Sequence, residues 1–169
     1  MWSEGTTVVD AMKLLEQLLL WVHGMSGAAW FGAIFYRTLV VDAKAFTFFT
    51  KPSEYEHFST HFAHNMRYFV VAGLLTCGLS GFALLGLRWD GSNVVWLALM
   101  VAKAAAWLGA CGLFTYVSWV HRPWRACAAP DEFAKYRRQG QRLAFEMVAL
   151  ACTGFALGQA CRAVPWLSA

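Results

Sequence analysis

The chain has 169 residues, of which 59% are hydrophobic and 14% are charged, and its formal net charge at pH 7 is +4. A soluble domain carries roughly 25% charged residues and roughly 45–50% apolar residues. Both departures exclude an ordinary soluble domain and predict an integral membrane protein with one domain over residues 1–169. Residues 1–4 lack the basic stretch of a signal peptide, so we expect no cleavage at this end.

Four apolar segments follow along the chain, at about residues 14–36, 62–87, 94–120 and 143–164. Each is close to the roughly 20 residues with which a helix crosses a hydrocarbon core of about 30 Å. Only helices and closed barrels satisfy their backbone hydrogen bonds inside lipid. The sequence therefore predicts an all-α fold, an integral membrane four-helix bundle that is embedded in a lipid bilayer.

Turn-forming residues separate the four segments, at residues 51–53, 90–93, 122–123 and 130–131. Pro165 is expected to close the last helix, because proline cannot donate the backbone hydrogen bond that a helix needs. Small residues recur within the segments, at Gly24/Gly27, Gly73/Cys77/Gly81, Gly109/Gly112 and Gly154/Gly158. They suit close helix packing and also leave room for a flat ligand. No internal repeat is apparent in the sequence.

Lysine and arginine are distributed unevenly between the two ends of the expected bundle. The end that holds both termini, called the terminal end below, carries Lys13, Arg88 and Arg162. The opposite end, called the basic end, carries Arg37, Lys44, Lys51, Arg67, Arg122, Arg125, Lys135, Arg137, Arg138 and Arg142. Lysine and arginine accumulate in cytoplasmic loops. We therefore expect the basic end in the cytoplasm and both termini on the outer, periplasmic side of a plasma (inner) membrane, and no nucleic-acid partner.

Two ionisable residues are expected deep in the bundle near the terminal end. His23 and Lys103 each stand about nine residues inside their helices, which puts both at a depth of roughly 13 Å. An ionisable group costs a few kcal/mol inside a bilayer, so each marks a candidate functional site. The alternatives are a satisfied interior histidine, and a lysine whose ammonium reaches back to the membrane surface.

A second polar level is expected near the basic end. His57, His61 and His64 share one helical face, and Arg67 follows one turn later. His121 ends the third apolar segment at the same level. Histidines at a membrane surface cost little, so ordinary interfacial residues are the alternative for this group.

The residues at both levels are of the kinds that bind haem b. Imidazole is a common ligand for haem iron, copper and zinc, and helix bundles hold cofactors between facing helices. A haem also needs small residues beside the ring, aromatic walls and cations for its propionates. The candidate cofactor-binding residues are His23, His64, His121, Lys103, Arg37 and Arg67.

The pairing of the histidines as axial ligands stays open. His64 and His121 form the better placed pair, because His23 lies roughly 15 Å from His64 along the membrane normal. His23 would take its second ligand from another helix at its own depth. One haem, two or none are all compatible with the sequence, and two would make an electron route across the bilayer.

Copper is the alternative to haem. Histidines one turn apart can meet one copper or zinc ion, so the candidate metal ligands are His23, His61, His64 and His121. The methionines are scattered, with no pair spaced to hold Cu(I) within a helix, which argues against a dedicated copper relay. The five cysteines form no CxxC pair.

Three stretches resemble one protein family. His23-x6-Trp30-x-Gly32, followed by Phe35-Tyr36-Arg37, resembles the first helix of the copper resistance protein D family. The relatives of that family include HemJ-type protoporphyrinogen oxidases and the membrane domain fused to some urate-metabolising proteins. "WLALMVAK" is similar to the family's lysine-bearing helix, and "RLAFEMVALACTGFALG" to its final helix before a proline.

The resemblance implies a four-helix membrane bundle that binds haem b or handles copper, with His23 and Lys103 as contacts to cofactor or substrate. We expect first a haem b protein that transfers electrons, with quinol as a candidate donor. It would act as a homo-oligomer or as a subunit of a larger membrane complex. A HemJ-type oxidase, a copper transport or resistance protein and a structural subunit are the alternatives.

Overall fold

The computed structural model describes residues 4–89, 93–129 and 131–167, and within them the chain is helical with no strand. Four helical stretches are long and apolar enough to cross a membrane: Val8–Ala45, Met66–Leu87, Val94–Arg125 and Phe133–Ala163. The predicted all-α class is confirmed. The chain is a multi-pass membrane protein by the length and composition of its helices.

The first half of the chain forms α1 (Glu4–Tyr36), the π turn η1 (Arg37–Val41), the short helix α2 (Asp42–Phe48) and the long helix α3 (Pro52–Leu87). Proline suits the first position of α3, because its fixed φ matches the helix and its missing N–H is not needed there. The prediction began this helix at residue 62. Residues 52–61 are too polar for a membrane span, although His57, His61 and His64 were already expected on one helical face.

The second half forms α4 (Val94–Tyr116), the π turn η2 (Val117–His121), the short helix α5 (Arg122–Ala126) and the long helix α6 (Phe133–Leu167). The side chain of Asn93 caps α4 by accepting a hydrogen bond of 2.9 Å from the backbone N of Trp96.

Two predicted helix ends in this half are wrong. Residues 122–123 do not break the helix, because Pro123 lies in the first turn of α5, where no backbone N–H is required. Pro165 does not close the last helix, which begins near residue 133 and extends to Leu167. Pro123 is tolerated because it follows a π turn and stands in the first turn of α5, and Pro165 is tolerated because α6 ends two residues later.

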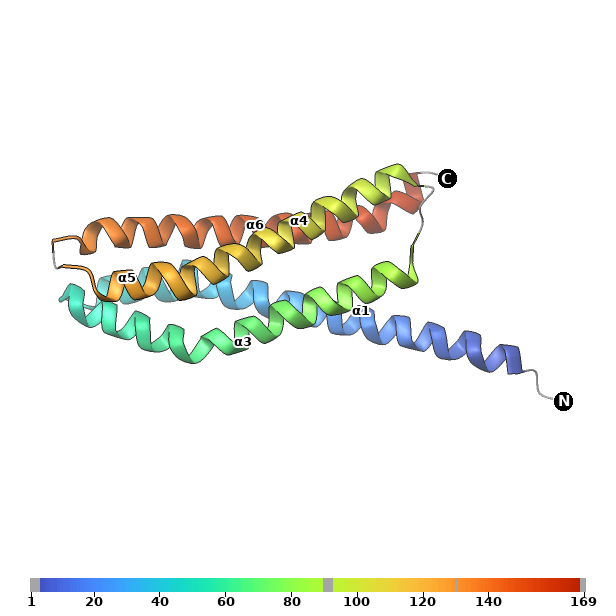
Figure 1. The fold of residues 1–169 in the computed structure, drawn as a ribbon, viewed down its shortest axis with the longest axis horizontal. Helices are drawn as coiled ribbons and strands as arrows, with labels where there is room; N and C mark the ends of the chain where they lie inside the picture. The colour runs from blue at the N-terminus through green and yellow to red at the C-terminus, as the bar shows by residue number, and fades with distance from the viewer. Residues whose placement is uncertain (1–3, 90–92, 130, 168–169) are drawn as a thin grey trace.

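The bundle consists of two antiparallel helix pairs. Figure 1 shows α1 lying along α3 and α4 lying along α6, and these two pairs also make the most extensive packing. The start of α1 and the end of α6 lie at the same end of the bundle, as expected, and the first turns of α1 extend beyond the other helices. The short helices and the π turns lie at the opposite, basic end.

The two pairs repeat one order of elements: a long helix, a π turn, a short helix and a second long helix. A tyrosine precedes each π turn, Tyr36 in the first half and Tyr116 in the second. Trp30 and Ala110, the buried residues of α1 and α4, both stand six positions before that tyrosine. The two halves of the chain therefore repeat one order of elements, which was not apparent in the sequence.

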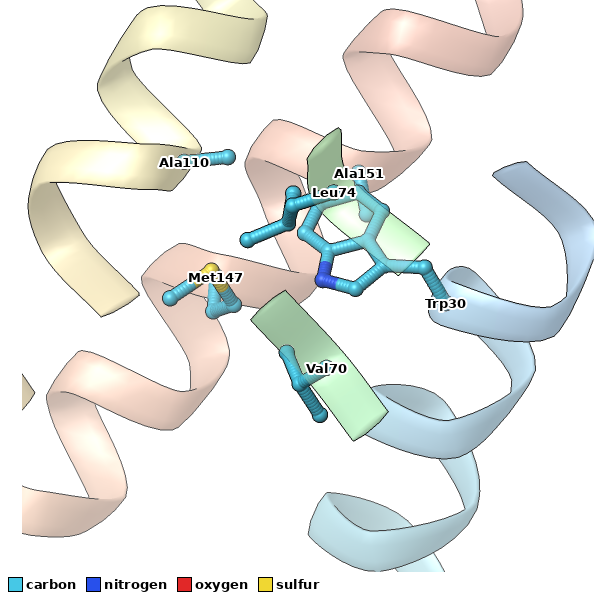
Figure 2. Close-up of a cluster of buried hydrophobic side chains, with 6 residues drawn as sticks. All are labelled: Trp30, Val70, Leu74, Ala110, Met147 and Ala151. Atoms are coloured by element: carbon cyan, nitrogen blue, oxygen red, sulfur yellow. The ribbon is translucent and has the colours of Figure 1, made fainter. Parts of the chain in front are cut away.

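The buried core is a single apolar layer in the middle of the bundle, to which all four long helices contribute: Trp30, Val70, Leu74, Ala110, Met147 and Ala151. Figure 2 shows the indole of Trp30 reaching from α1 toward the side chains of the other helices. Ala110 and Ala151 are 1% and 2% exposed, so their small side chains leave the space that the indole fills.

Most large apolar side chains point outward instead of into this layer. Leu18, Phe69, Leu79, Val101 and Phe145 are all more than half exposed. A contiguous apolar surface of this extent is unfavourable in water and suits contact with lipid acyl chains. The thin core and the apolar exterior are therefore what a membrane bundle requires.

Substitution of Gly78 tests the contact between the two helix pairs. Gly78 of α3 faces the ring of Trp107 on α4, and a Cβ at this position would lie 2.3 Å from the nearest ring atom. The indole is held in place because its Nε1 donates a hydrogen bond of 3.2 Å to the carbonyl O of Leu74. We expect Gly78→Ala to lower the free energy of unfolding by about 1–3 kcal/mol.

Gly86→Ala is the control on the same helix, because a Cβ there meets no atom within 4 Å. Thermal unfolding in detergent measures both variants against the parent. Equal unfolding midpoints for the two variants would contradict the described packing of Trp107.

Candidate functional site

His23 turns from α1 into the bundle, where its ring is half-buried. Its Nδ1 lies 2.9 Å from the carbonyl O of Cys77 and 3.3 Å from Oγ of Ser80, both on α3. A carbonyl oxygen can only accept, so Nδ1 carries the ring proton. The lone pair is then on Nε2, and α3 fixes the direction in which it points.

Lys103 on α4 approaches this lone pair. Its Nζ lies 3.3 Å from Nε2 of His23 and donates a hydrogen bond to it. The imidazole is neutral in this arrangement, because an imidazolium would have no lone pair to offer and would repel the ammonium. The expectation that His23 and Lys103 share one depth in the bundle is confirmed by this contact.

Two glycines on the returning helices make room for the pair. A Cβ on Gly81 would lie 3.0 Å from Cε1 of His23, and a Cβ on Gly158 would lie 3.7 Å from Nζ of Lys103. His23 thus packs on α3 as Lys103 packs on α6. Each of the two also stands 13 positions before the tyrosine that precedes its π turn. They occupy equivalent positions of the repeat and meet between its halves.

A cavity of about 450 Å³, called the terminal cavity below, lies beside this contact. Its walls are mostly apolar, and its cationic groups are Lys103, Arg88 and Arg162. None of its lining residues carries a carboxylate, although Glu16 forms an ion pair with Arg88. The cavity has the size of a cofactor site and an excess of positive charge.

A second cavity of about 330 Å³, called the basic cavity below, lies at the basic end. No residue lines both cavities. Trp30 lines the terminal cavity, and its core neighbours Val70 and Met147 line the basic cavity. The apolar layer of Figure 2 therefore separates the two.

Both π turns contribute to the basic cavity, η1 through Arg37 and Thr38 and η2 through Val117 and His121. π turns are rare in helices and occur frequently at functional sites, because the extra residue redirects the side chains that follow. In each half of the repeat, the chain thus departs from the α-helix where it reaches this cavity.

His121 is the buried histidine of the basic end, with 4% of its surface exposed. Its ring lies between those of Tyr116 and Tyr136, with centroid distances of 6.4 and 6.3 Å. Its Nε2 has no hydrogen-bond partner among the described residues. His64, its expected partner as an axial ligand, is exposed on α3 and lines neither cavity. The structure does not bring the two together.

The remaining predicted site residues are placed at the basic end. Arg37 lines the basic cavity, 3.6 Å from a carboxylate oxygen of Asp42, and donates a hydrogen bond of 3.3 Å to Oγ of Ser59. Arg67 lines neither cavity. It donates a hydrogen bond of 2.9 Å to the carbonyl O of Ser118 and so satisfies a backbone acceptor of η2.

His57, His61 and His64 are all exposed along α3. Within the described part of the chain, no three His, Cys, Asp or Glu side chains are grouped so that they could hold a metal ion. The structure therefore combines His23 with Lys103, and leaves the other candidate metal ligands, His61, His64 and His121, apart from it.

Sequence reasoning did not identify several residues of these sites. Cys77, Gly81 and Gly158 were recognised only as small residues, because the sequence does not tell that they face His23 and Lys103 across the bundle. Arg88 and Arg162 were counted only as charges of the terminal end. Their spacing in the chain carries no sign of a shared cavity.

The chain matches no family model, no curated protein and no solved structure.

The ion pair between Arg125 and Glu56 provides a test of the basic end. The Arg125 guanidinium donates two hydrogen bonds, of 2.5 and 2.6 Å, to the Glu56 carboxylate, and both side chains are less than 15% exposed. We expect Glu56→Gln to lower the free energy of unfolding by roughly 2–4 kcal/mol, because it leaves a half-buried guanidinium without its counter-ion.

Glu54→Gln is the matched control. Glu54 pairs with Lys51 at 3.7 Å, but the two side chains are 50% and 74% exposed. Its loss should change the stability by less than about 0.5 kcal/mol. Chemical or thermal unfolding of both variants decides the point, and equal effects would mean that the Arg125–Glu56 pair does not hold the basic end.

Proposed function

We propose that the protein binds haem b in the terminal cavity, with Nε2 of His23 as an axial ligand, and transfers electrons within the membrane. The observation that carries the proposal is the orientation of His23. Its Nδ1 is held by the carbonyl O of Cys77, so the lone pair lies on Nε2, where it accepts from Nζ of Lys103 beside the terminal cavity. Metal-binding histidines are commonly fixed in this way through their other ring nitrogen.

The residues of the terminal cavity fit a flat, apolar ring with acidic side groups. A Cβ on Gly24 or Gly154 would meet no atom within 4 Å, so the cavity is open at both positions. Trp107 and Phe155 supply aromatic walls. Arg88 and Arg162 supply positive charge for two propionates.

Trp30 of the apolar layer also lines this cavity. Its indole is 9% exposed, and its Nε1 has no hydrogen-bond partner among the described residues. A buried donor without a partner costs free energy. No residue that the structure describes removes that cost.

A bound haem b supplies one-electron chemistry, and the protein tunes it through the axial ligand and the surrounding charge. The carbonyl of Cys77 keeps His23 in the required tautomer. Lys103 contributes a positive charge that stabilises the reduced state of a nearby redox centre. Its flexible four-carbon stem lets Nζ leave Nε2 when another partner binds there.

The proposed setting follows from the same arrangement. The uneven distribution of lysine and arginine supports a plasma membrane in which the basic end faces the cytoplasm. An electron carrier inside the bilayer exchanges electrons with quinol or with neighbouring subunits. We therefore propose a quinol-linked protein that acts as a homo-oligomer or within a larger membrane complex.

Haem binding is tested by absorption spectra of the purified protein before and after reduction by dithionite, with metal analysis of the same sample. We expect a Soret band, a sharp α band on reduction and near-stoichiometric iron. His23→Ala should abolish the bands, because it removes the axial ligand. His64→Ala is the control, since this exposed histidine lines neither cavity.

Loss of the bands in His64→Ala but not in His23→Ala would move the haem to the basic end. Detection of bound copper without a Soret band would contradict haem binding. It would favour a function in copper transport or resistance, the alternative that the family resemblance leaves open.

A second candidate function is the oxidation of a porphyrinogen, as in HemJ-type oxidases. It is favoured by Lys103, which faces the same cavity as His23 and can bind a substrate carboxylate. In the electron-transfer proposal, expression of the chain does not restore growth of a bacterial strain that lacks protoporphyrinogen oxidase. Rescue by the parent, lost in both His23→Ala and Lys103→Met, would replace electron transfer by the oxidase function.

A further inference from the structure

We propose that the basic cavity binds the phosphate group of an anionic phospholipid, with Arg122 and His121 as its principal contacts. This site is distinct from the proposed haem site. The two cavities share no lining residue, and the apolar layer around Trp30 lies between them.

The charge around the basic cavity is not balanced by the protein. Four arginines line it: Arg37, Arg122, Arg125 and Arg137. Two carboxylates face them, Asp42 beside Arg37 and Glu56 beside Arg125. The guanidinium of Arg122 therefore has no carboxylate of its own at this place. A phosphate group, with its negative charge and several acceptor oxygens, would compensate it.

Arg122 is the arginine that a ligand would engage first. Its half-buried guanidinium makes no hydrogen bond and no ion pair with any residue that the structure describes. The nearby carboxylate of Asp42 is already paired with Arg37. Burial of a guanidinium without a counter-ion is unfavourable. Arg37 and Arg125, in contrast, already bond to side chains of the protein.

His121 independently indicates a ligand. His121 lines the basic cavity, and only 4% of its surface is exposed. Its Nε2 has no hydrogen-bond partner among the described residues. A buried ring nitrogen without a partner is costly, whereas an N–H at this position could donate to a phosphate oxygen.

Neutral donors surround the same space. Tyr55 and Ser59 of α3 both line the basic cavity. Burial, together with the nearby carboxylate of Asp42, raises the pKa of the Tyr55 hydroxyl. Tyr55 therefore keeps its proton at neutral pH and can act as a hydrogen-bond donor. The cavity thus combines cations with hydroxyl donors, as phosphate binding requires.

The inner part of the cavity explains why the phosphate should belong to a lipid. It is lined by apolar side chains from all four long helices: Ile34, Phe62, Met66, Val70, Phe114 and Met147. An inorganic anion would leave these walls uncovered. An acyl chain would cover them while its head group stays at the membrane surface, where basic pockets between membrane helices bind anionic lipids.

Gly140 on α6 allows the cationic groups to approach each other. A Cβ at this position would lie 3.2 Å from Nη1 of Arg125 and 3.3 Å from Cε1 of His121. A side chain here would push α6 away from both groups and change the shape of the cavity.

Native mass spectrometry of the delipidated protein, titrated with phosphatidylglycerol and with phosphatidylcholine, tests the proposal. The parent should bind one phosphatidylglycerol at least about fivefold more tightly than phosphatidylcholine. Arg122→Gln should lower the affinity for phosphatidylglycerol roughly five- to tenfold, because one cationic contact is lost. Arg138→Gln is the control, since Arg138 is exposed on the same end and lines neither cavity.

Two further variants keep the test decisive if Arg122→Gln does not fold. Arg122→Lys retains the charge and should keep most of the affinity, whereas His121→Phe retains the ring and should lower the affinity for phosphatidylglycerol. The proposal would be overturned if Arg122→Gln and His121→Phe bound phosphatidylglycerol as tightly as the parent does. It would also be overturned if the parent bound the two lipids with equal affinity.

Two other results would assign the cavity to a different ligand and also overturn the proposal. Displacement of phosphatidylglycerol by millimolar inorganic phosphate, with the same stabilisation of the protein, would show that the site takes a free anion. Loss of the haem bands in Arg122→Gln and His121→Phe, with lipid binding unchanged, would show that the cavity holds haem. Failure of the haem proposal alone shows itself differently, as a missing Soret band in the parent.

Discussion

The packing of Trp30 against two alanines is the interaction on which the rest of the bundle depends. Its indole fills the middle of the molecule because Ala110 on α4 and Ala151 on α6 present almost no side chain there. The layer takes residues from all four long helices and joins the two halves of the repeat, together with contacts such as those of His23 with Lys103 and of Gly78 with Trp107. It also closes the bundle to polar groups, so that the space above it and the space below it become separate cavities.

The polar groups on either side of this layer follow from the lack of water inside a bilayer. An ionisable side chain in such an interior needs a partner from the protein or from a ligand. His23 finds the carbonyl of Cys77 and the ammonium of Lys103, across the boundary between the two halves. Nε2 of His121 finds no such partner among the described residues, and Arg122 shares the carboxylate of Asp42 with Arg37. The first arrangement supports a metal-binding imidazole, and the second supports an anionic ligand that arrives from outside the chain.

The fold was largely predictable from the sequence, because lipid imposes its rules on local composition. Four apolar segments of sufficient length must be helices, and the uneven distribution of lysine and arginine distinguishes the two ends of the bundle. The helix ends were harder to predict. Residues 52–61 and 133–142 continue α3 and α6 as polar helices beyond the expected spans, and Pro123 lies within a continuing helix. The repeat of helix pairs was not predicted either. It is a repeat of the order of elements and of a few buried positions, and the sequence itself does not repeat.

The candidate site was predictable only in part. The depth of His23 and Lys103 could be counted along each helix, because the rise per residue is constant. The sequence by itself therefore determined the class of fold, the membrane environment and the level of these two side chains. Only the tertiary structure decided that they meet, that His64 faces away while His121 is buried, and that Arg88 and Arg162 share a cavity. The physical reason is that rotation and pairing of the helices depend on contacts such as that of Gly78 with Trp107, which involve residues far apart in the chain.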